Sequence, residues 1–453
     1  MIIPQNRLLF LFALIVLPFV IIGTIFAVAV ELSSGIIVLF VLIVAIDAVL
    51  SRLRLDGITM ELPSVVRLSK DKKGAIEFRL KNARAKKAII RIGLAFPDEL
   101  VADNEDLLLQ LPPGRDLNHF SWPCTGLTRG NYKFEKCYWE TASPFGLWSF
   151  RTSRALNMEV RVYPNLARER KSLAAFFLNR GMFGIHAQRQ IGQGREFEKL
   201  REYVYGDSYD HIHWKATARR GRPVTKVFQI EKTQEVYVIV DASRLSARKS
   251  QDLPGNEQAS AVHTPETILE RFINAALIMG LIAERQGDIF GLLSFNNRVR
   301  SFIKAKNGKV HFNVCRDALY TLQPQTVNPD FDDLFTFIGQ RLRRRALLIF
   351  LTNLDDPVLA ESFMKNIELI DRKHLVLVNM LKPAGAQNLF SRSNIDSLND
   401  IYSDLGGHIT LHNLLEIQKV LRLRGVNFSL LGSENFCTQI VSQYIAVKQR
   451  QLI

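Results

Sequence analysis

The stretch EVYVIVDAS, Glu235–Ser243, decides the fold of the longest part of the chain. Its run Val236–Val240 is uninterrupted by charge and predicts a strand buried on both faces, as in a parallel sheet covered by helices. The stretch ends in an acid and a hydroxyl, Asp241 and Ser243. Because ligands of parallel sheets bind beyond the carboxyl ends of the strands, the loop that begins at Asp241 is the first predicted site.

Strands and helices alternate after this stretch. TILERFINAALIMGLIAERQG has apolar residues at helical spacing and ends at Gly287, and DIFGLLSF and VRSFIKA predict a hairpin around Asn296 and Asn297. The segments ALLIFLT, HLVLVNM and VNFSLL are further predicted strands, with helical patterns between them. This order predicts an α/β domain over residues 235–453, with a mostly parallel sheet, helices on both faces and an antiparallel edge from the hairpin.

Residues 1–54 predict a transmembrane helical hairpin. Leu8–Val30 is a run of 23 uncharged residues. At about 1.5 Å per residue, such a run can cross a hydrocarbon core of roughly 30 Å. The hydrophilic break ELSSG (31–35) separates it from a second apolar run, Ile36–Leu50. The first run is longer than a usual signal-peptide core and a second span follows, so we expect a membrane hairpin rather than a cleaved signal.

The flanking charges predict the orientation of the hairpin. Arg7 precedes the first span, Arg52 and Arg54 follow the second, and the connecting loop carries only Glu31. The positive-inside rule therefore places both ends, and the soluble remainder, in the cytoplasm. Asp47 lies inside the second span near its basic end. We expect it to reach the interface or to pair with Arg52 or Arg54 rather than to form a proton or ion site.

Residues 55–165 predict an antiparallel β-sandwich. AIEFRLK (75–81) places Ile76, Phe78 and Leu80 on one face and charged residues on the other. AIIRIGLAF, NHFSWPC and GNYKFEKCYWE are further short runs between clusters of Asn, Gly, Pro and Asp. Residues 166–234 are a predicted connector whose helix ends near Arg180.

The composition is globular and basic. A formal charge of +15, from 59 Lys and Arg against 44 Asp and Glu, suits nucleic acid, anionic lipid or an acidic protein partner. The four cysteines are scattered without a CxxC pair, which gives no disulfide or zinc-finger signature and suits a reducing compartment. The sequence contains neither GxxxxGK[ST] nor a Gly-x-Ser-x-Gly elbow, so it predicts neither nucleotide hydrolysis nor a serine nucleophile.

The segment GREFEKLREYVYGDSYDHIHWKATAR, residues 194–219, resembles the signature of the bacterial family named after domain of unknown function 58. RGNY, SPFGLW and VYPNL upstream and DASRL downstream are also similar to that family. The resemblance implies two amino-terminal spans, a β region, a von Willebrand factor A-like domain and association with AAA+ ATPases of the MoxR type. Asp210 stands where the family usually has Arg. The matching residues are Glu196, Phe197, Leu200, Arg201, Tyr203, Gly206, Asp207, Ile212, Trp214, Lys215, Thr217, Ala218 and Arg219.

The signature segment, residues 194–221, allows several chemical interpretations. His211 and His213 would point the same way on a strand and could begin a metal site, and Asp207 with either His could act in catalysis. Its basic residues could contact phosphates, but interleaved acids nearly cancel their charge. We therefore favour a structural clamp that joins the two soluble domains and offers a docking face, with Ile212 and Trp214 buried.

The A-domain resemblance implies a magnesium site built from Asp-x-Ser-x-Ser, a Thr from a second loop and an Asp after a later strand. Asp241 and Ser243 match, but Leu245 takes the third position and Ser246 is displaced by one residue. Asn353 stands where the later Asp is expected, and Asp332 or Asp333 replaces the Thr. The resemblance thus predicts a degenerate Mg²⁺ site at Asp241, Ser243 and Asn353; the alternative is that Asp241 and Ser243 only cap their loop.

Taken together, these patterns predict a nonenzymatic, membrane-anchored scaffold in the bacterial inner membrane, with two spans and its soluble domains in the cytoplasm. We expect it to need no cofactor and to bind the lipid bilayer and a protein partner, a MoxR-type ATPase that works on membrane or envelope complexes, and no specific nucleic acid. The first alternative is a Mg²⁺-dependent adhesion module or enzyme that uses Asp241, Ser243 and the two His residues. The second is a membrane-tethered nucleic-acid binder.

Overall fold

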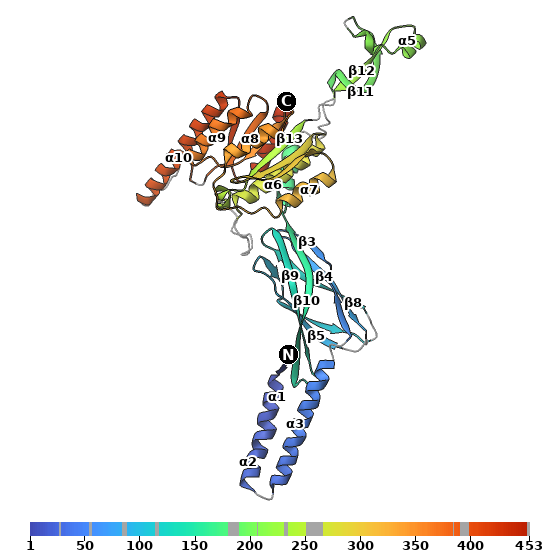
Figure 1. Ribbon diagram of the computed structural model, residues 1–453, viewed down its shortest axis with the longest axis vertical. Coiled ribbons are helices and arrows are strands. Elements are labelled where there is room, and N and C mark those ends of the chain that lie inside the picture. Colours follow the sequence, from blue (N-terminus) through green and yellow to red (C-terminus); the bar gives the residue numbers. More distant parts are fainter. Residues whose placement is uncertain are drawn as a thin grey trace. The chain divides into compact units, whose positions relative to one another are not determined.

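The structure is a computed structural model that describes residues 1–26, 29–53, 57–83, 88–113, 117–179, 190–205, 207–230, 234–250, 266–383, 385–389 and 398–450 (Figure 1). Within these ranges the side chains of residues 51–53, 88, 179, 190–199 and 227–230 are not described. The chain forms two compact units that divide between Asn165 and Leu166. Each unit is described by itself below.

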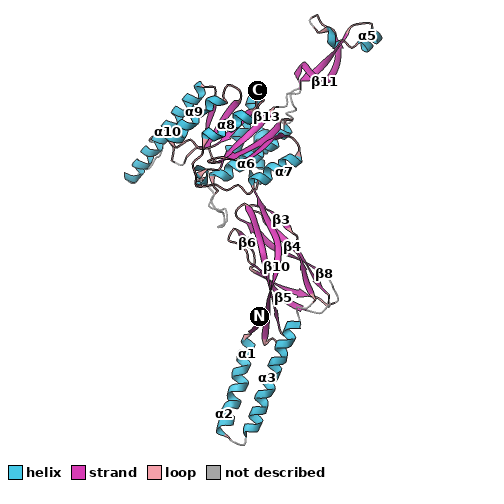
Figure 2. Ribbon diagram, viewed as in Figure 1, coloured by secondary structure: helices cyan, strands magenta, loops and turns pink. Residues whose placement is uncertain are grey.

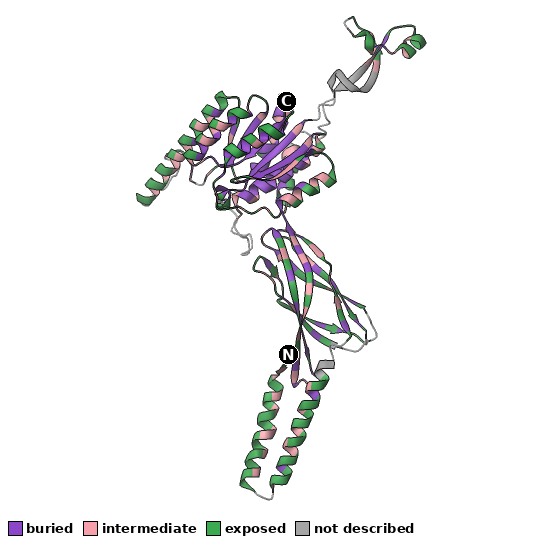
Figure 3. Cartoon of the chain, in the orientation of Figure 1, coloured by how far each residue is buried: buried purple, intermediate pink, exposed green. Residues whose placement is uncertain are grey.

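The first unit begins with a short strand and a helical hairpin. Asn6–Ile25 and Val30–Leu50 are both long and apolar enough to cross a membrane. In the most apolar stretch of Asn6–Ile25, no residue is buried. Figure 3 shows exposed and half-buried residues along both helices. Between α1 and α2 the helix widens into a π-turn just before Pro18, a residue that cannot donate a backbone hydrogen bond. The elements are β1 (Ile2–Pro4), α1 (Asn6–Leu11), the π-helix η1 (Phe12–Val16), α2 (Leu17–Ile25) and α3 (Val30–Leu53).

The predicted break ELSSG is wrong, because these residues lie inside α3 and the hairpin turns between Ile25 and Val30. Ser34 Oγ donates to the Glu31 carbonyl 2.9 Å away, so its hydroxyl is satisfied within the helix. Ser33 is buried against Gly23, where an added Cβ would lie 3.5 Å from the Ser33 Cβ. The small polar residues therefore form a helix contact of the kind that lets membrane helices approach closely, rather than a loop.

Two sheets pack face to face in the rest of the first unit (Figure 2), which confirms the predicted β-sandwich. One sheet has the order β1-β10-β9-β5-β7 with β3 added to β10, and the other has the order β2-β4-β8-β6. The pairs are antiparallel except β3 with β10. Trp122 and Trp139 are fully buried in the core between the sheets. The strands are β2 (Ile58–Glu61), β3 (Val65–Ser69), β4 (Lys73–Asn82), β5 (Ala88–Leu94), β6 (Leu100–Ala102), β7 (Asp106–Leu111), β8 (Leu117–Gly126), β9 (Gly130–Ala142) and β10 (Trp148–Tyr163).

The second unit contains a six-stranded sheet of order β15-β14-β13-β16-β17-β18. Only β15 is antiparallel, and it follows β14 through the predicted hairpin. This topology confirms the predicted von Willebrand factor A-like α/β domain. The strands are β13 (Glu235–Asp241), β14 (Ile289–Phe295), β15 (Val299–Lys306), β16 (Leu347–Leu351), β17 (Leu375–Leu381) and β18 (Asn427–Leu431).

Helices cover both faces of this sheet, because alternate residues of the parallel strands enter two separate apolar layers. Val238 and Ile349 pack against α6 and α11, whereas Ile239 and Phe350 pack against α8 and α9. The helices are α6 (Ile268–Arg285), α7 (Lys309–Leu319), α8 (Phe331–Arg341), α9 (Pro357–Asn366), α10 (Leu398–Leu423) and α11 (Phe436–Gln449), with the short 3₁₀ helices η4 (Arg244–Ala247) and η5 (Ile367–Leu369).

The predicted connector helix is present as α4 (Ala167–Asn179), but it packs into the α/β core rather than lying between domains. Leu173 is buried in the same apolar layer as α6 and α11. Glu169 is also buried and accepts a hydrogen bond of 3.0 Å from Asn274 Nδ2 of α6. Burial raises the pKa of the Glu169 carboxyl above its ordinary value. The sequence therefore predicted the helix α4 but not its packing against α6 and α11.

The signature segment forms a small module of its own. β11 (Gln190–Glu202) pairs with β12 (Val224–Ile230) in an antiparallel ladder, and between them lie the 3₁₀ helix η3 (Tyr209–His211) and the helix α5 (Trp214–Arg220). The helix α5 ends at Gly221, whose φ of +63° is the left-handed conformation that glycine adopts most readily.

Candidate functional site

Asp241 and Thr352 meet at the carboxyl edge of the central strands of the α/β sheet. Asp241 ends β13 and Thr352 follows β16, the neighbouring strand. The Thr352 hydroxyl donates to Asp241 Oδ2 at 2.6 Å, and the Ser243 backbone N–H donates to Asp241 Oδ1 at 2.8 Å. Asp241, Ser243 and Thr352 are all fully buried. Burial raises the pKa of the Asp241 carboxyl, and these hydrogen bonds oppose that shift.

Two oxygens beside this carboxylate have no hydrogen-bond donor. They are Ser243 Oγ and Asn353 Oδ1, both buried. The Asn353 amide nitrogen is held by the Leu245 carbonyl at 3.4 Å. Hydroxyl, amide and carboxylate oxygens are hard ligands of the type that Mg²⁺ prefers. The predicted residues Asp241, Ser243 and Asn353 are therefore gathered in one buried polar cluster.

The rest of the expected ligand shell is displaced. Leu245 is buried, and the Ser246 hydroxyl donates to the Ser243 carbonyl at 2.7 Å instead of adding a ligand. Asp332 and Asp333 lie exposed in the first turn of α8, where the Asp333 carboxylate accepts from the Val299 N–H. Among the residues that the structure describes, no group of three or more His, Cys, Asp or Glu side chains could hold a metal ion. One carboxylate with neutral oxygens falls short of a typical Mg²⁺ site.

The loop that approaches Asp241 from the other side was not identified from the sequence. The Gln325 N–H donates to the Ala242 carbonyl at 2.9 Å and the Arg244 N–H donates to the Val327 carbonyl at 3.0 Å. These two bonds hold the backbone of residues 325–327 next to the Asp241 loop, and Thr326, whose side chain is exposed, lies between the two bonded residues. Its flanking sequence, QTVNP, has no helical or strand pattern that would have singled it out.

Two arginines tie the loops of this edge together. The guanidinium of Arg244 donates to Asn328 and, at 3.0 Å, to Asp356 Oδ2, and Arg248 forms an ion pair with Asp355. Arg244 and Arg248 come from the loop after β13, whereas Asp355 and Asp356 come from the loop after β16. The arginine side chains remain 42% and 49% exposed. We call these four residues the edge clamp; it neutralises the two carboxylates that lie nearest in sequence to Asn353.

The signature module is fastened by hydrogen bonds of its own residues. Asp207 accepts from Arg201 at 2.6 Å and from the Val204 N–H at 3.1 Å, and the Tyr203 and Tyr209 rings stack with centroids 6.0 Å apart. Thr217 Oγ1 accepts from the Val224 N–H at 3.1 Å, which joins α5 to β12. Gly206 and the side chains of Glu196 and Phe197 lie outside the described residues.

The metal and burial hypotheses for this module need correction. His213 Nδ1 accepts from the Ala216 N–H at 3.0 Å and caps α5, so that nitrogen is already used. His211 ends η3 rather than lying on a strand with His213, so the two side chains lack the common direction that the metal hypothesis required. Ile212 is buried as expected, but Trp214 is 69% exposed. Lys215, Ala218 and Arg219 are exposed as well.

A second buried aspartate, Asp47 of α3, binds the SPFGLW loop between β9 and β10. Ser143 Oγ donates to Asp47 Oδ2, and the N–H groups of Phe145 and Leu147 donate to its two oxygens at 3.1 and 3.3 Å. Trp148 Nε1 donates to the Val44 carbonyl at 3.0 Å. The side chains of Arg52 and Arg54 lie outside the described residues. The sequence analysis identified SPFGLW as a family motif but did not predict that Asp47 binds it.

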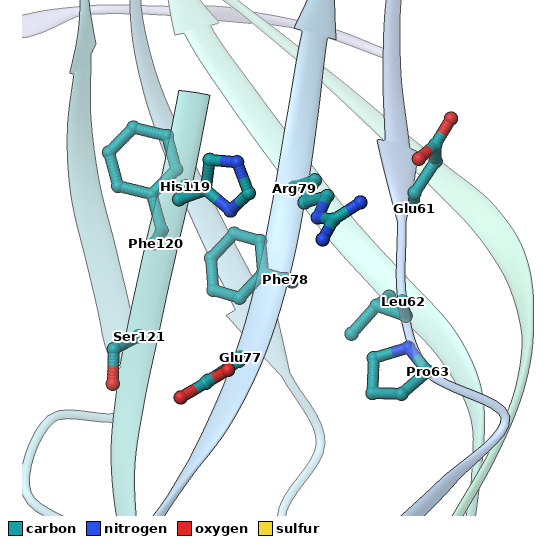
Figure 4. A pocket seen from close by; sticks show the side chains of 9 residues that line it. All are labelled: Glu61, Leu62, Pro63, Glu77, Phe78, Arg79, His119, Phe120 and Ser121. Atoms are coloured by element: carbon teal, nitrogen blue, oxygen red, sulfur yellow. The ribbon is translucent and has the colours of Figure 1, made fainter. Parts of the chain in front are cut away.

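The sandwich also contains a pocket of about 640 Å³ (Figure 4). The pocket opens where β2 ends, before Pro63, which has no backbone N–H to donate to a neighbouring strand. In the described residues, β2 pairs only with the part of β4 from Arg79 onward, so the earlier part of β4 has a partner strand on its β8 side alone. In Figure 4 the β4 residues lie between those of the β2 end and those of β8. An extended peptide could pair with this free edge. The lining residues are Glu61, Leu62, Pro63, Glu77, Phe78, Arg79, His119, Phe120 and Ser121.

Comparisons with known proteins find similarities to parts of this chain. No curated protein matches the chain. Among solved structures, the SpRpn10 VWA domain has 8% identity and a TM-score of 0.27, with 47% of this chain and 95% of that chain covered. An aerotolerance-related membrane protein from Bacteroides fragilis has 11% identity and a TM-score of 0.28 over 46% and 97% of the two chains. BatB from Bacteroides thetaiotaomicron has 12% identity and a TM-score of 0.28 over 48% and 99%.

The sequence match to a family covers less than half of the chain. A protein-family model described as “Protein of unknown function DUF58” matches residues 199–389. The matched range begins within β11, includes α5 and the Asp241 cluster, and extends past β17. Over this part of the chain the match confirms the resemblance of the signature segment to that family.

Proposed function

We propose that this protein is a scaffold anchored in a bacterial inner membrane by its two amino-terminal helices, with its soluble units in the cytoplasm. The support for anchoring is the exposure of large apolar side chains along both helices, among them Phe10, Ile25, Val38 and Val49 at 63–67%. Such a surface is unfavourable in water and suits a hydrocarbon core. The positive-inside rule supports the cytoplasmic orientation. A reporter that is active only in the cytoplasm should be active when it is fused to the carboxyl terminus. A reporter that is active only outside the cytoplasm should be inactive at the same position.

The function proposed for the α/β domain is binding of a protein partner at the carboxyl edge of its sheet. The observation that carries it is the edge clamp. It holds the loops after β13 and β16 in place and presents two half-exposed guanidiniums beside a buried polar cluster. Arginine in a fixed position is enriched at the centre of protein interfaces. By analogy with the family, the partner is a MoxR-type AAA+ ATPase that acts on membrane or envelope complexes.

Binding of the purified full-length protein to a MoxR-type ATPase in detergent micelles tests this function. We expect the Arg244→Glu, Arg248→Glu double variant to weaken binding by tenfold or more, since it places like charges beside Asp355 and Asp356. Arg424→Glu is the matched control, because Arg424 forms a comparable exposed ion pair with Glu368, 3.0 Å long, after α10. Equal loss in the control, or no loss in the double variant, contradicts the proposal.

A Mg²⁺-dependent adhesion function is the second candidate, favoured by the donor-less oxygens of Ser243 and Asn353 beside Asp241. If a metal is bound, these oxygens and the Asp241 carboxylate hold it, and it would supply a positive charge for a partner's carboxylate. Elemental analysis of the purified protein separates the two candidates. Stoichiometric magnesium that disappears in Asp241→Ala supports the metal-dependent function, and purified protein without magnesium contradicts it.

A further inference from the structure

One face of the helix α5 is exposed and combines an aromatic ring with cations. At 3.6 residues per turn, Trp214 and Ala218 lie above one another, and Lys215 and Arg219 lie beside them. All four side chains are exposed, whereas Ala216 and Thr217 on the opposite side are half-buried against β12. We call Trp214, Lys215, Ala218 and Arg219 the α5 face; Figure 1 labels the helix.

The aromatic part of this face is larger than the fold of the module requires. Trp214 is 69% exposed, and nearby in sequence Tyr209 is 75% and Tyr205 99% exposed. The buried side of the module is formed by Ile212, Val224 and Thr225, which are at most 7% exposed. Burial of a Trp ring at an interface is strongly favourable because it removes a large apolar surface from water. The exposure of Trp214 in this module therefore points to a partner that covers the ring.

The cations of the α5 face are not neutralised within the module. Of the acids nearest in sequence, Asp207 pairs with Arg201 at 2.6 Å and Glu202 with Arg222 at 3.3 Å, whereas the exposed Asp210 forms no ion pair with a cation of α5. Among the described residues, Lys215, Arg219 and the adjacent Arg220 form no ion pair. The balance of acids and bases along the segment therefore hides a local excess of positive charge on α5, which the negative end of the helix dipole beneath Arg219 and Arg220 offsets only in part.

We propose that the α5 face binds an acidic segment of a protein partner, with Trp214 covering apolar side chains and Lys215 and Arg219 pairing with carboxylates. Charge complementarity selects an acidic partner, and a large aromatic ring with two cations beside it suits a segment that presents apolar and acidic residues next to one another. This inference rests on the proposed scaffold function, but it uses a surface separate in sequence from the edge clamp.

Binding of a labelled peptide rich in Glu and Leu to the full-length protein in micelles, followed by fluorescence anisotropy, tests the inference. A peptide with Lys in place of Glu, vesicles containing phosphatidylglycerol and single-stranded DNA are compared in parallel. We expect the acidic peptide to bind and Trp214→Ala and the Lys215→Glu, Arg219→Glu double variant each to weaken it by about tenfold. Arg222→Ala is the matched control, since Arg222 is already paired with Glu202 and lies outside the α5 face.

Equal binding of the acidic and basic peptides, or tighter binding of vesicles or DNA than of the acidic peptide, overturns the inference. So does an unchanged affinity in both α5 variants when circular dichroism shows that they are folded. The edge-clamp variant distinguishes this result from failure of the proposed function: Arg244→Glu, Arg248→Glu should leave peptide binding unchanged. Loss of ATPase binding in that variant with no effect of the α5 variants on the peptide would disprove this inference alone.

Discussion

Asp47 and Asp241 are both completely buried, yet they differ in what surrounds them. Asp47 accepts from one hydroxyl and two backbone N–H groups of the SPFGLW loop, and it joins the second membrane helix to the β-sandwich. Asp241 accepts from the Thr352 hydroxyl and from the backbone N–H groups of Ser243 and Asn353, but the side-chain oxygens of Ser243 and Asn353 have no hydrogen-bond partner of their own. One carboxylate is enclosed by donors alone, and the other by a mixture of donors and unused acceptors.

This difference separates a structural contact from a binding site. A buried carboxylate that receives several hydrogen bonds holds two elements together. Unused buried acceptors, in contrast, cost free energy in the folded protein and persist where a ligand or a function compensates for them. We therefore expect changes at Asp47 to act on stability and changes around Asp241 to act on the response to pH and cations.

Asp47→Ala should have the largest effect. It leaves the Ser143 hydroxyl and the N–H groups of Phe145 and Leu147 without an acceptor in a buried position. We expect the free energy of unfolding of the first unit to fall by about 3 kcal/mol. Thermal unfolding of the full chain in micelles measures it. Asp106→Ala is the control, because Asp106 forms an exposed pair with Arg91 and its loss should cost little.

Asp241→Asn should change the pH dependence of stability. Burial raises the folded pKa of Asp241 above its ordinary value of 3.8, so between these two values the folded state binds more protons than the unfolded state. The free energy of unfolding of the wild type should therefore fall as the pH rises from 3.8 through the folded pKa. The variant should lack this decline and be more stable than the wild type at neutral pH.

Denaturant unfolding at a series of pH values, wild type against Asp241→Asn, measures this difference. Glu169 also has a raised pKa and contributes a decline of the same sign to both proteins, so only the difference between them reports on Asp241. A variant that loses stability at neutral pH instead would indicate that the Asp241 carboxylate is stabilised by a bound cation.

The apolar patterns predicted most of the fold because they are local. The run Val236–Val240 and the hairpin around Asn296 identified the sheet and its antiparallel edge, and the alternation in β4 identified the sandwich. The prediction of a loop at ELSSG was wrong because small polar residues occur both in loops and where two helices pack closely. The contact of Ser33 with Gly23 on the other helix, which the sequence does not reveal, distinguishes the two cases.

The candidate sites were less predictable because their contacts join distant residues. Thr352 lies 111 residues from Asp241, Asp356 lies 112 from Arg244, and Ser143 lies 96 from Asp47. The acidic and hydroxyl members of the Asp241 cluster could be selected by their place after predicted strands. The edge clamp could not, since an arginine pattern on its own does not show which acids it reaches.

Asn353→Asp should give the α/β domain a measurable response to Mg²⁺. The new carboxylate adds a second negative charge beside Asp241 and the Ser243 hydroxyl, which moves the cluster toward a usual Mg²⁺ shell. We expect millimolar Mg²⁺ to increase the free energy of unfolding of the variant by about 1 kcal/mol, as binding to the folded state alone requires. Thermal unfolding with and without Mg²⁺ measures it. Asn328→Asp, beside Arg244, serves as the control for added charge.

Arg248→Ala should have the smallest effect on stability and thereby separate the edge clamp from the buried cluster. The Arg248 side chain is 49% exposed and the Asp355 side chain 12%, so solvent still reaches the pair, and its loss should reduce the free energy of unfolding by only about 0.5 kcal/mol. Affinity for the ATPase should nevertheless decrease, because the guanidinium contributes to the proposed contact surface. Parallel measurements of unfolding and binding test both statements. A stability loss as large as that of Asp47→Ala would mean that the edge clamp holds the fold together, as Asp47 does. In that case only the buried Asp241 cluster would distinguish this edge of the sheet from the structural contact at Asp47.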